Sequence, residues 1–510
     1  MSTTDVQDHI VRPDPPEPKG VPPIAWSVLA PILLFATAGT VFAASRYHLF
    51  GDELYFIAAG AHPSVSYADQ GPILPLLAAF TDALPGDSLI VFRLPSIILT
   101  VIAVGVTGLI AREMGGGRTA QALAALAYGT STLLLLQANL LATNAIDAPL
   151  WVIITWGIVR WVRTRQDRLL LVAALVTALD LQAKWLVPVL WIGVVVGVAA
   201  VGPRDLLRRP LLWVGGLIVV ISAIPSIVWQ ATHDWPQLQL SQQVAVEQAY
   251  IGGRLLFLPL LIVFAGALGV PLLVAGLWRL FRNSDARPYR FLGIAFLVVV
   301  VIFLAVNGRP YYPAGMLAVV MAAGAVGVAD IAARRRSIGM GAGVVAATSL
   351  VVVVVAMPWK PADQITQAAS VEDAAAMISV YGQFGWPELT RDVRGVVGSE
   401  SADPTHPTPT AIVSDSYWQA GALEYYGSDL PPVYSPSRGF GYLGTPPDSA
   451  TSVLWVDASD NGRPKACAAA EPIRTITGRL AFPGAATDVT IWRCSVATPW
   501  SQQWTDLQHI

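Results

Sequence analysis

The stretch "IAWSVLAPILLFATAGTVFAASRYHLFGDELYFIAAGAHPSVSYADQGP", residues 24–72, sets a pattern that recurs along the chain. Residues 24–45 are almost wholly apolar and long enough to cross a bilayer as a helix. The polar island that follows, residues 46–72, places Asp52 directly beside Glu53. Ionised carboxylates are unfavourable near hydrocarbon, so an acid pair at a membrane edge predicts a functional site.

The composition of the whole chain places most of it in a membrane. Apolar residues make up 54% of the sequence and charged residues 13%, whereas soluble domains carry about 25% charged residues. The mean hydropathy is +0.56. The formal net charge of −2 gives no sign of a nucleic-acid partner, so the distribution of charge along the chain is the informative quantity.

Apolar stretches that could span a membrane recur throughout the first 357 residues. They lie near residues 24–45, 89–111, 119–138, 145–162, 168–183, 186–202, 211–230, 255–280, 291–307, 312–333 and 338–357. If the N-terminus is cytoplasmic, most arginines fall in cytoplasmic loops, and the outward loops hold Arg46, Arg93, Lys184, Arg254 and Arg309. Basic residues favour cytoplasmic loops, so this alternation predicts eleven spans and an external C-terminus.

The chain divides into three predicted parts. Residues 1–23 are polar and Pro-rich and are expected to form a disordered cytoplasmic tail, and residues 24–357 hold the spans. Beyond them, "TAIVSD" and "SVLWVD" indicate short buried strands and "SYWQAGALEYYG" a helix, which predicts an extracytoplasmic α/β domain over residues 358–510. An oxidising compartment would permit a disulfide between Cys467 and Cys494; the alternative is two unrelated free thiols.

The acid pair supplies the first candidate catalytic residues. Successive residues on a helix point about 100° apart, so Asp52 and Glu53 do not address one atom in the same way. One is expected to face the reacting group, while the other contacts a cation, a backbone amide or a neighbouring helix. Asp147, at the external end of the fourth span, is either a further functional carboxylate or a helix N-cap, with Asn144 as the rival cap.

The five outward cations suggest what the acid pair would face. Arginine binds phosphate through a planar fork and lysine binds it as a point charge. The alternative is that each side chain only extends along the membrane surface to keep its charge in water. Taken together, the five residues favour the phosphate group of a lipid.

The sequence leaves the question of a metal open. Candidate ligands are Glu53, His48 and His62, with Asp69 nearby. These residues lack the close spacing, such as HxxxH, that is typical of many metal sites. We therefore predict no definite cofactor and keep a divalent metal as an open alternative.

A long external loop, "IVWQATHDWPQLQLSQQVAVEQAY" at residues 227–250, precedes Arg254. Its Trp, Gln and Tyr side chains suit stacking on sugar rings and hydrogen bonding to hydroxyl groups. The alternative is that the aromatic residues are membrane anchors, which is their usual role at an interface.

In these stretches the chain resembles the integral-membrane glycosyltransferases that use polyprenyl-phosphate sugars, the protein O-mannosyltransferase and aminoarabinose-transferase relatives of the GT-C superfamily. The matching stretches are "FGDELYFIAAG", "YADQGPILPLL", "FRLPSII", "AREMGGGRTAQALAAL", "TNAIDAPLW", "IVWQATHDWP", "GRPYYPAGMLAVVMAAGA", "FGWPELTRDV", "SDSYWQAGALEYYG" and "LPPVYSPSRGFGYLG". They cover nearly the whole chain. The resemblance implies a polytopic α-helical membrane fold of the GT-C type with about eleven transmembrane helices and a C-terminal extracytoplasmic α/β domain.

The resemblance also implies a reaction. A sugar on a polyprenyl phosphate, presented from the outer leaflet, is transferred with inversion to an extracytoplasmic glycan, lipid or protein. Asp52 matches the catalytic carboxylate of the family and would act as general base. The chain would then be a hexosyl- or pentosyltransferase of the cell membrane that needs no nucleotide.

Further residues take their expected roles from the same resemblance. Asp52 and Glu53 match the family's acidic pair, and Arg93 matches the arginine that opens the second span. Lys184 matches a basic position before an aromatic residue, and Arg309 stands where many relatives have lysine before paired tyrosines. The expected substrate-binding residues are Arg46, Tyr55, Gln70, Arg93, Lys184, Arg254, Arg309, Tyr311 and Tyr312.

Two other functions are compatible with a polar edge on a membrane protein. A transporter or flippase of a lipid-linked sugar would also need external cations, but it would place charged or broken helices near the bilayer midplane. Here the ionisable residues cluster at the external edge, which favours chemistry there. A membrane-anchored binding protein would not need the polar detail between the spans.

Overall fold

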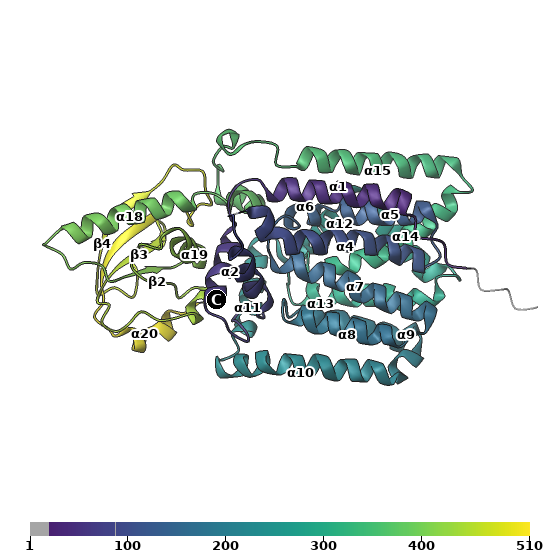
Figure 1. Ribbon diagram of the computed structural model, residues 1–510, viewed down its shortest axis with the longest axis horizontal. Helices are drawn as coiled ribbons and strands as arrows, with labels where there is room; N and C mark the ends of the chain where they lie inside the picture. The colour runs from purple at the N-terminus through teal and green to yellow at the C-terminus, as the bar shows by residue number, and fades with distance from the viewer. Residues whose placement is uncertain (1–19, 87, 510) are drawn as a thin grey trace, which may run out of the picture.

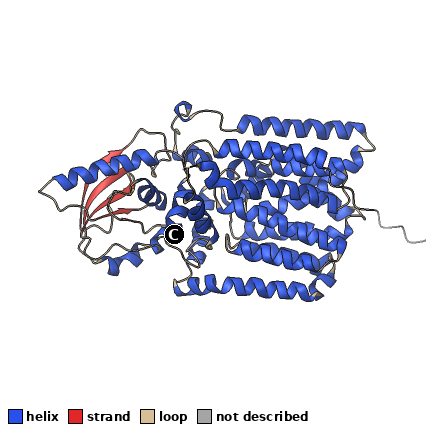
Figure 2. Cartoon of the chain, in the orientation of Figure 1, coloured by secondary structure: helices blue, strands red, loops and turns tan. Residues whose placement is uncertain are grey.

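The computed structural model describes residues 20–86 and 88–509. A bundle of long helices makes up one part, and a smaller domain lies against one end of it (Figure 1). The strands, drawn in red in Figure 2, lie in this smaller domain. Most of the predicted cytoplasmic tail, residues 1–19, lies outside the described residues.

The bundle follows the predicted apolar stretches closely. Its helices are α1 (Trp26–Ala44), α4 (Leu89–Glu113), α5 (Arg118–Gly129), α6 (Thr132–Gln137), α7 (Thr143–Thr164), α8 (Arg168–Leu181), α9 (Val187–Val201), α10 (Pro210–Thr232), α12 (Gly253–Arg282), α13 (Arg290–Ala305), α14 (Ala314–Ala332) and α15 (Arg336–Ala356). The residues of α14 are mostly buried, whereas few residues of α1, α10 and α15 are buried. A central helix thus lies among others whose apolar faces point outward, as lipid requires.

Eight of the described helices are long and apolar enough to cross a membrane. The other three predicted spans are shorter or broken. The stretch 119–138 is divided into α5 and α6, and the stretches 168–183 and 186–202 form α8 and α9, of 14 and 15 residues. A helix of 14 residues is only about 21 Å long, so the turn between α8 and α9, which contains Lys184, is recessed into the bundle.

The break between α5 and α6 faces a bend in α12. Gly266 has a φ of 76°, and a Cβ there would lie 2.9 Å from the carbonyl oxygen of Thr130. The left-handed backbone and the close approach both favour glycine. The two irregular segments therefore fit against each other inside the bundle.

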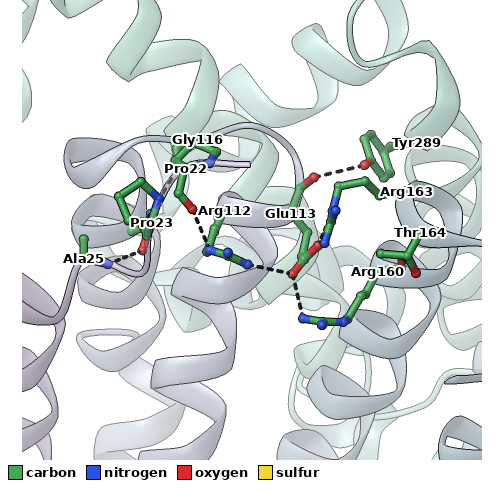
Figure 3. A network of polar contacts seen from close by, with 11 residues as sticks. Pro22, Pro23, Ala25, Arg112, Glu113, Gly116, Arg160, Arg163, Thr164 and Tyr289 are labelled. Atoms are coloured by element: carbon green, nitrogen blue, oxygen red, sulfur yellow. Dashed lines mark hydrogen bonds and ion pairs between the residues drawn. The ribbon is translucent and has the colours of Figure 1, made fainter. Parts of the chain in front are cut away.

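The loops that are rich in arginine gather at the end of the bundle away from the smaller domain (Figure 1). There Glu113 is fully buried and accepts ion pairs from Arg112 (3.1 Å), Arg160 (3.1 Å) and Arg163 (2.5 Å). Figure 3 shows the three guanidinium groups converging on one carboxylate, with the Tyr289 hydroxyl donating to the Glu113 carbonyl oxygen. Residues from separate predicted cytoplasmic loops thus share one end of the bundle.

The smaller domain is built on a five-stranded sheet in the order β2-β1-β3-β5-β4. Its strands are β1 (Ala411–Ser414), β2 (Val433–Tyr434), β3 (Ser452–Ala458), β4 (Ala469–Ile476) and β5 (Val489–Ser495). β1 pairs in parallel with β2 and β3, and the pairs β3–β5 and β4–β5 are antiparallel. Its helices are α16 (Val371–Ala376), α17 (Ile378–Tyr381), α18 (Trp386–Ala402), α19 (Tyr417–Tyr426) and α20 (Trp500–Leu507). The two strands expected from sequence are present as β1 and β3, and the expected helix as α19; β2, β4 and β5 are additions.

Helices α2 (Gly51–Ala61) and α11 (Pro236–Tyr250) lie between the bundle and the sheet (Figure 1). Helix α3 (Ile73–Asp82) contacts α2 and α4. One buried apolar cluster joins Leu54 and Phe56 of α2 to Leu423 of α19 and to Leu454 of β3. The polar island of the sequence is therefore packed into the C-terminal domain, and the two parts of the chain share a core.

Cys467 and Cys494 form a disulfide in the structure, with Cα atoms 5.3 Å apart. It closes a loop over β4 and the turn into β5. On chain-entropy arguments such a bridge stabilises the domain by about 3 kcal/mol. We expect reduction, or Cys467→Ser, to lower the unfolding temperature, and non-reducing peptide mapping to recover the two cysteines in one linked peptide. Recovery of both as free thiols from native protein would contradict this.

Candidate active site

The acid pair lies where α2 packs against α19. Two glycines allow the close approach: a Cβ on Gly51 would lie 2.3 Å from the Trp418 ring, and a Cβ on Gly421 would lie 2.9 Å from the backbone of α2. This contact brings Tyr417 and Trp418, the first residues of α19, against the N-terminal turn of α2. Asp52 is in that turn.

Asp52 is held by two donors from the C-terminal domain. Its Oδ1 accepts hydrogen bonds from the Tyr417 hydroxyl (2.8 Å) and from Nε1 of Trp418 (2.7 Å). Because both bonds go to one oxygen, they orient the carboxylate without occupying Oδ2. Asp52 is only partly buried, so this second oxygen is suited to accept a proton from a substrate.

Glu53 has the opposite environment. It is fully buried, and its carboxylate forms a two-point ion pair with Arg93, with Nε 2.8 Å from Oε1 and Nη2 2.6 Å from Oε2. The same oxygens accept from the backbone N–H groups of Phe50 and Leu141, each at 2.8 Å. Glu53 therefore fastens α2 to α4 and to the start of α7, as one member of the adjacent pair was expected to do.

Arg93 is also fully buried, and its remaining donors are used inside the protein. They bond to the carbonyl oxygens of Ala44 (2.9 Å) and His48 (2.9 Å) and to Oε1 of Gln383 (3.2 Å). A guanidinium has five N–H donors, and these bonds together with the Glu53 pair engage all of its nitrogens. We therefore do not retain Arg93 among the candidate phosphate ligands; its geometry is that of a structural residue.

A second carboxylate, Asp69, lies beside the first. It accepts a hydrogen bond from the Tyr55 hydroxyl (2.9 Å). Burial raises the pKa of Asp69 to about 6, and the Tyr55 bond and the Arg438 guanidinium oppose this rise. Close packing holds Tyr55 in place, because a Cβ on Gly439 would lie 1.9 Å from its hydroxyl oxygen. The neighbouring Gln70 is buried, and its side-chain amide has no hydrogen-bond partner within the described residues.

Two arginines converge on one carboxylate of α11. Nη2 of Arg438 lies 2.7 Å from Oε1 of Glu247, and Arg309 pairs with Oε2 of the same side chain. Arg438 comes from the C-terminal domain and Arg309 from the loop before α14. The Arg438 guanidinium also lies 5.2 Å from the centre of the Tyr417 ring, and Asp52 acts on it electrostatically. These cations therefore belong to the same site as Asp52.

Lys184 lies in the recessed turn between α8 and α9, against the paired tyrosines. Its Nζ is 4.7 Å from the centre of the Tyr312 ring and 5.7 Å from that of Tyr311, and it donates to Oδ1 of Asn144. Aromatic faces attract an ammonium group. Asp52 also acts electrostatically on Lys184. The structure thus brings Lys184, Arg309 and the tyrosines close to one another.

Asp147 is buried close to Lys184, next to the buried Asp180 of α8. The alternative that Asp147 or Asn144 caps a helix is wrong, because the N-cap of α7 is Ala142 and no side chain caps it. Asp147 remains a candidate functional carboxylate, and it is more buried than Asp52. Asp180 was not among the candidate site residues predicted from the sequence.

Two outward cations are bound to backbone carbonyl groups. Arg46 donates to the carbonyl oxygens of Pro358 (3.1 Å) and Trp359 (3.3 Å), where the chain leaves α15. Arg254 donates to the carbonyl oxygen of Ala305 (2.7 Å) at the end of α13. Both satisfy carbonyl groups at helix ends, so neither is placed as a ligand for the same phosphate as Arg309.

The suggested metal ligands do not fit a metal site. Glu53 is taken up by Arg93, Nδ1 of His62 lies 3.1 Å from the carbonyl oxygen of Ala58, and the ring of His48 packs edge-on against Phe384. Within residues 20–86 and 88–509, no three His, Cys, Asp or Glu side chains gather in a way that could hold an ion. We derive no step that involves a metal.

The family model for dolichyl-phosphate-mannose-protein mannosyltransferase matches residues 69–229, a range that contains Asp147 and Lys184 but not Asp52. No curated protein matches the chain in sequence.

Two solved structures share the fold. ArnT from Cupriavidus metallidurans, in the apo state, is similar over 86% of this chain and 94% of its own, with a TM-score of 0.54 and 14% identity. Arabinofuranosyltransferase AftD from Mycobacteria is similar over 92% of this chain but only 42% of its own, with a TM-score of 0.52 and 14% identity. The chain is thus similar to a mannosyltransferase family model over residues 69–229, and its fold is similar to the folds of these two solved structures.

Proposed function

We propose that the protein transfers a sugar from a polyprenyl-phosphate donor to an extracytoplasmic acceptor. The acceptor would be a glycan, lipid or protein of the cell envelope, and the protein would lie in the cell membrane with its C-terminal domain outside. The observation that carries this proposal is the placement of Asp52. Its carboxylate is oriented by Tyr417 and Trp418 and lies in the same cluster as Lys184 and Arg438.

In the proposed reaction, Oδ2 of Asp52 takes the proton of an acceptor hydroxyl or amine. The acceptor atom then forms a bond to the anomeric carbon, and the bond from that carbon to the phosphate oxygen breaks. The phosphate leaves with the bonding electrons, and the anomeric centre is inverted because the acceptor attacks from the face opposite the phosphate. Cations placed where this negative charge grows stabilise the transition state; the candidates are Lys184, Arg309 and Arg438.

We propose a role for Asp69 that differs from the role of Asp52 as general base. Burial raises its pKa to about 6, so Asp69 takes up a proton more readily than an ordinary aspartate. Through Tyr55 it is in contact with α2, the helix that carries Asp52. We assign Asp69 to positioning and to the local charge balance rather than to proton abstraction.

The test is transfer in vitro by purified protein in nanodiscs. A panel of polyprenyl-phosphate sugars would be supplied together with an envelope acceptor fraction, with and without EDTA, and the products analysed by mass spectrometry. We expect one sugar to become covalently attached to the acceptor and free polyprenyl phosphate to accumulate. Movement of the intact donor across a bilayer without any covalent product would indicate the transporter alternative instead.

A further inference from the structure

The geometry points to a phosphate site formed by Arg309 and Arg438, which is closed in this structure by the carboxylate of Glu247 on α11. This inference rests on the proposed function and names the part of the site that would receive the donor. In it, the phosphate of the lipid-linked sugar replaces the Glu247 carboxylate, and α11 moves aside to admit it.

The first support is the chemistry of the contact. Two guanidinium groups from distant parts of the chain bind the two oxygens of one carboxylate. Arginine forks match carboxylate and phosphate oxygens in the same manner. A phosphodiester and a carboxylate each carry one negative charge, so one can replace the other without changing the charge of the cluster.

The second support is the place of the pair in the site. Arg438 faces the ring of Tyr417, whose hydroxyl binds Asp52. Arg309 precedes the tyrosines that face Lys184. A phosphate on these arginines would therefore lie between the proposed general base and the recessed lysine, where the leaving group of the proposed reaction is needed.

The third support is the construction of α11. Its N-terminal boundary has two non-glycine residues in the left-handed region, Asp234 (φ 59°) and Trp235 (φ 54°). Its C-terminal boundary has Gly252 (φ 98°) and Gly253 (φ 52°). Unusual backbone conformations of this kind cluster at moving segments and functional sites. Both ends of α11 are therefore suited to act as hinges.

The helix is also loosely held between these ends. Of its residues only Pro236 and Gln248 are buried, and the Nε2 atom of buried Gln248 has no partner within the described residues. An open cavity of about 450 Å³ lies between α11 and the adjoining ends of α12 and α13, with Val246 and Ala249 on its wall. Displacing α11 would break the two ion pairs of Glu247 and the hydrogen bonds that Asn307 and Arg309 donate to Ala245 and Gln248. Glu247, which is 28% exposed, would turn into water.

The inference predicts that Glu247 competes with the donor. When a binding-competent state is only fractionally populated, the apparent affinity falls by that fraction. Glu247→Gln should therefore bind a lipid phosphate about three- to tenfold more tightly than wild type. Arg309→Gln and Arg438→Gln should each bind it about tenfold or more weakly, because each removes a charged hydrogen-bond donor.

The experiment measures binding of farnesyl phosphate to the full-length protein in detergent, by intrinsic tryptophan fluorescence. Farnesol serves as the ligand without phosphate, inorganic phosphate as the ligand without lipid, and Asp234→Asn as the control that removes a charge beside α11 but leaves both arginines paired. Tighter binding of farnesyl phosphate by Glu247→Gln alone, with no change for farnesol, supports the inference.

Three outcomes would overturn it. Weaker binding by Glu247→Gln would make Glu247 a residue that positions the arginines. Inorganic phosphate binding as tightly as farnesyl phosphate would indicate a general anion site. Absence of farnesyl phosphate binding in both wild type and Glu247→Gln would show that Arg309 and Arg438 do not form a lipid-phosphate site. Since none of these measurements uses sugar transfer, the proposed function could still succeed or fail separately in the transfer assay.

Discussion

Replacing Asp52 by asparagine is expected to lower turnover by at least about 100-fold while donor binding survives, because general-base contributions are typically about 10²–10⁴-fold. Asparagine keeps the shape of the side chain, and its Oδ1 can still accept the bonds from Tyr417 and Trp418. What is lost is the proton acceptor at the other position. Turnover and farnesyl phosphate affinity would be measured for the same nanodisc preparation.

The matched control for this substitution is Glu53→Gln. Its main expected defect is structural, since Glu53 binds Arg93 and two backbone amides inside the core. The fraction of folded protein should fall, while the turnover of the folded fraction changes less than in Asp52→Asn. Near-normal turnover by Asp52→Asn would refute the assignment, and Asp147 would then be the next candidate.

Removal of Arg93 is expected to destabilise the protein by about 3–5 kcal/mol, the usual consequence of leaving one charge of a buried pair without its partner. Both side chains of the pair are fully buried, so Arg93→Ala leaves the Glu53 carboxylate unable to reach water. We expect a markedly lower unfolding temperature in detergent and a loss of monodisperse protein. Arg93→Lys should rescue only part of the stability, because an ammonium group cannot bind both oxygens in the same way.

Two further variants test whether Arg93 has a structural role. Arg118→Ala removes an exposed arginine at the far end of the bundle and should have little effect. The double variant Glu53→Gln with Arg93→Met should be more stable than Arg93→Ala, since replacing both members of a buried pair avoids the unpaired charge. If Arg93→Ala unfolds at the wild-type temperature but binds farnesyl phosphate weakly, then Arg93 is a phosphate ligand and the structural assignment is incorrect.

Several residues of the candidate site could not be predicted from the sequence. Tyr417, Trp418 and Arg438 occur in stretches that could be matched to the family, "SDSYWQAGALEYYG" and "LPPVYSPSRGFGYLG", yet they are more than 360 residues from Asp52 in the chain. Nothing in their local pattern distinguishes them from ordinary residues of a soluble domain. The signal that could have pointed to them is the pair of small residues, Gly51 and Gly421, at which two helices touch.

Arg93 is the opposite case, because it was predicted to bind phosphate and is instead paired with Glu53. A charged residue at the start of a span has the same sequence appearance whether it binds a substrate or a buried partner. Arg46 and Arg254 illustrate the same point, because both bind carbonyl groups at helix ends. Only burial and the directions of the donors separate a ligand from a structural ion pair.

By itself the sequence determined the apolar stretches, their alternation with arginine, the strand and helix signals of the C-terminal part and the importance of the polar island. These properties are local: hydrophobic length and charge bias act over about 20 residues and need no knowledge of distant contacts. The tertiary structure alone decided which member of the acid pair faces the site, which cations converge, and that the C-terminal domain contributes Tyr417, Trp418 and Arg438. The physical reason is that burial and hydrogen-bond partners belong to the packed chain. Asp52 and Glu53 are neighbours in sequence, but a turn of about 100° on α2 leaves one partly exposed and encloses the other.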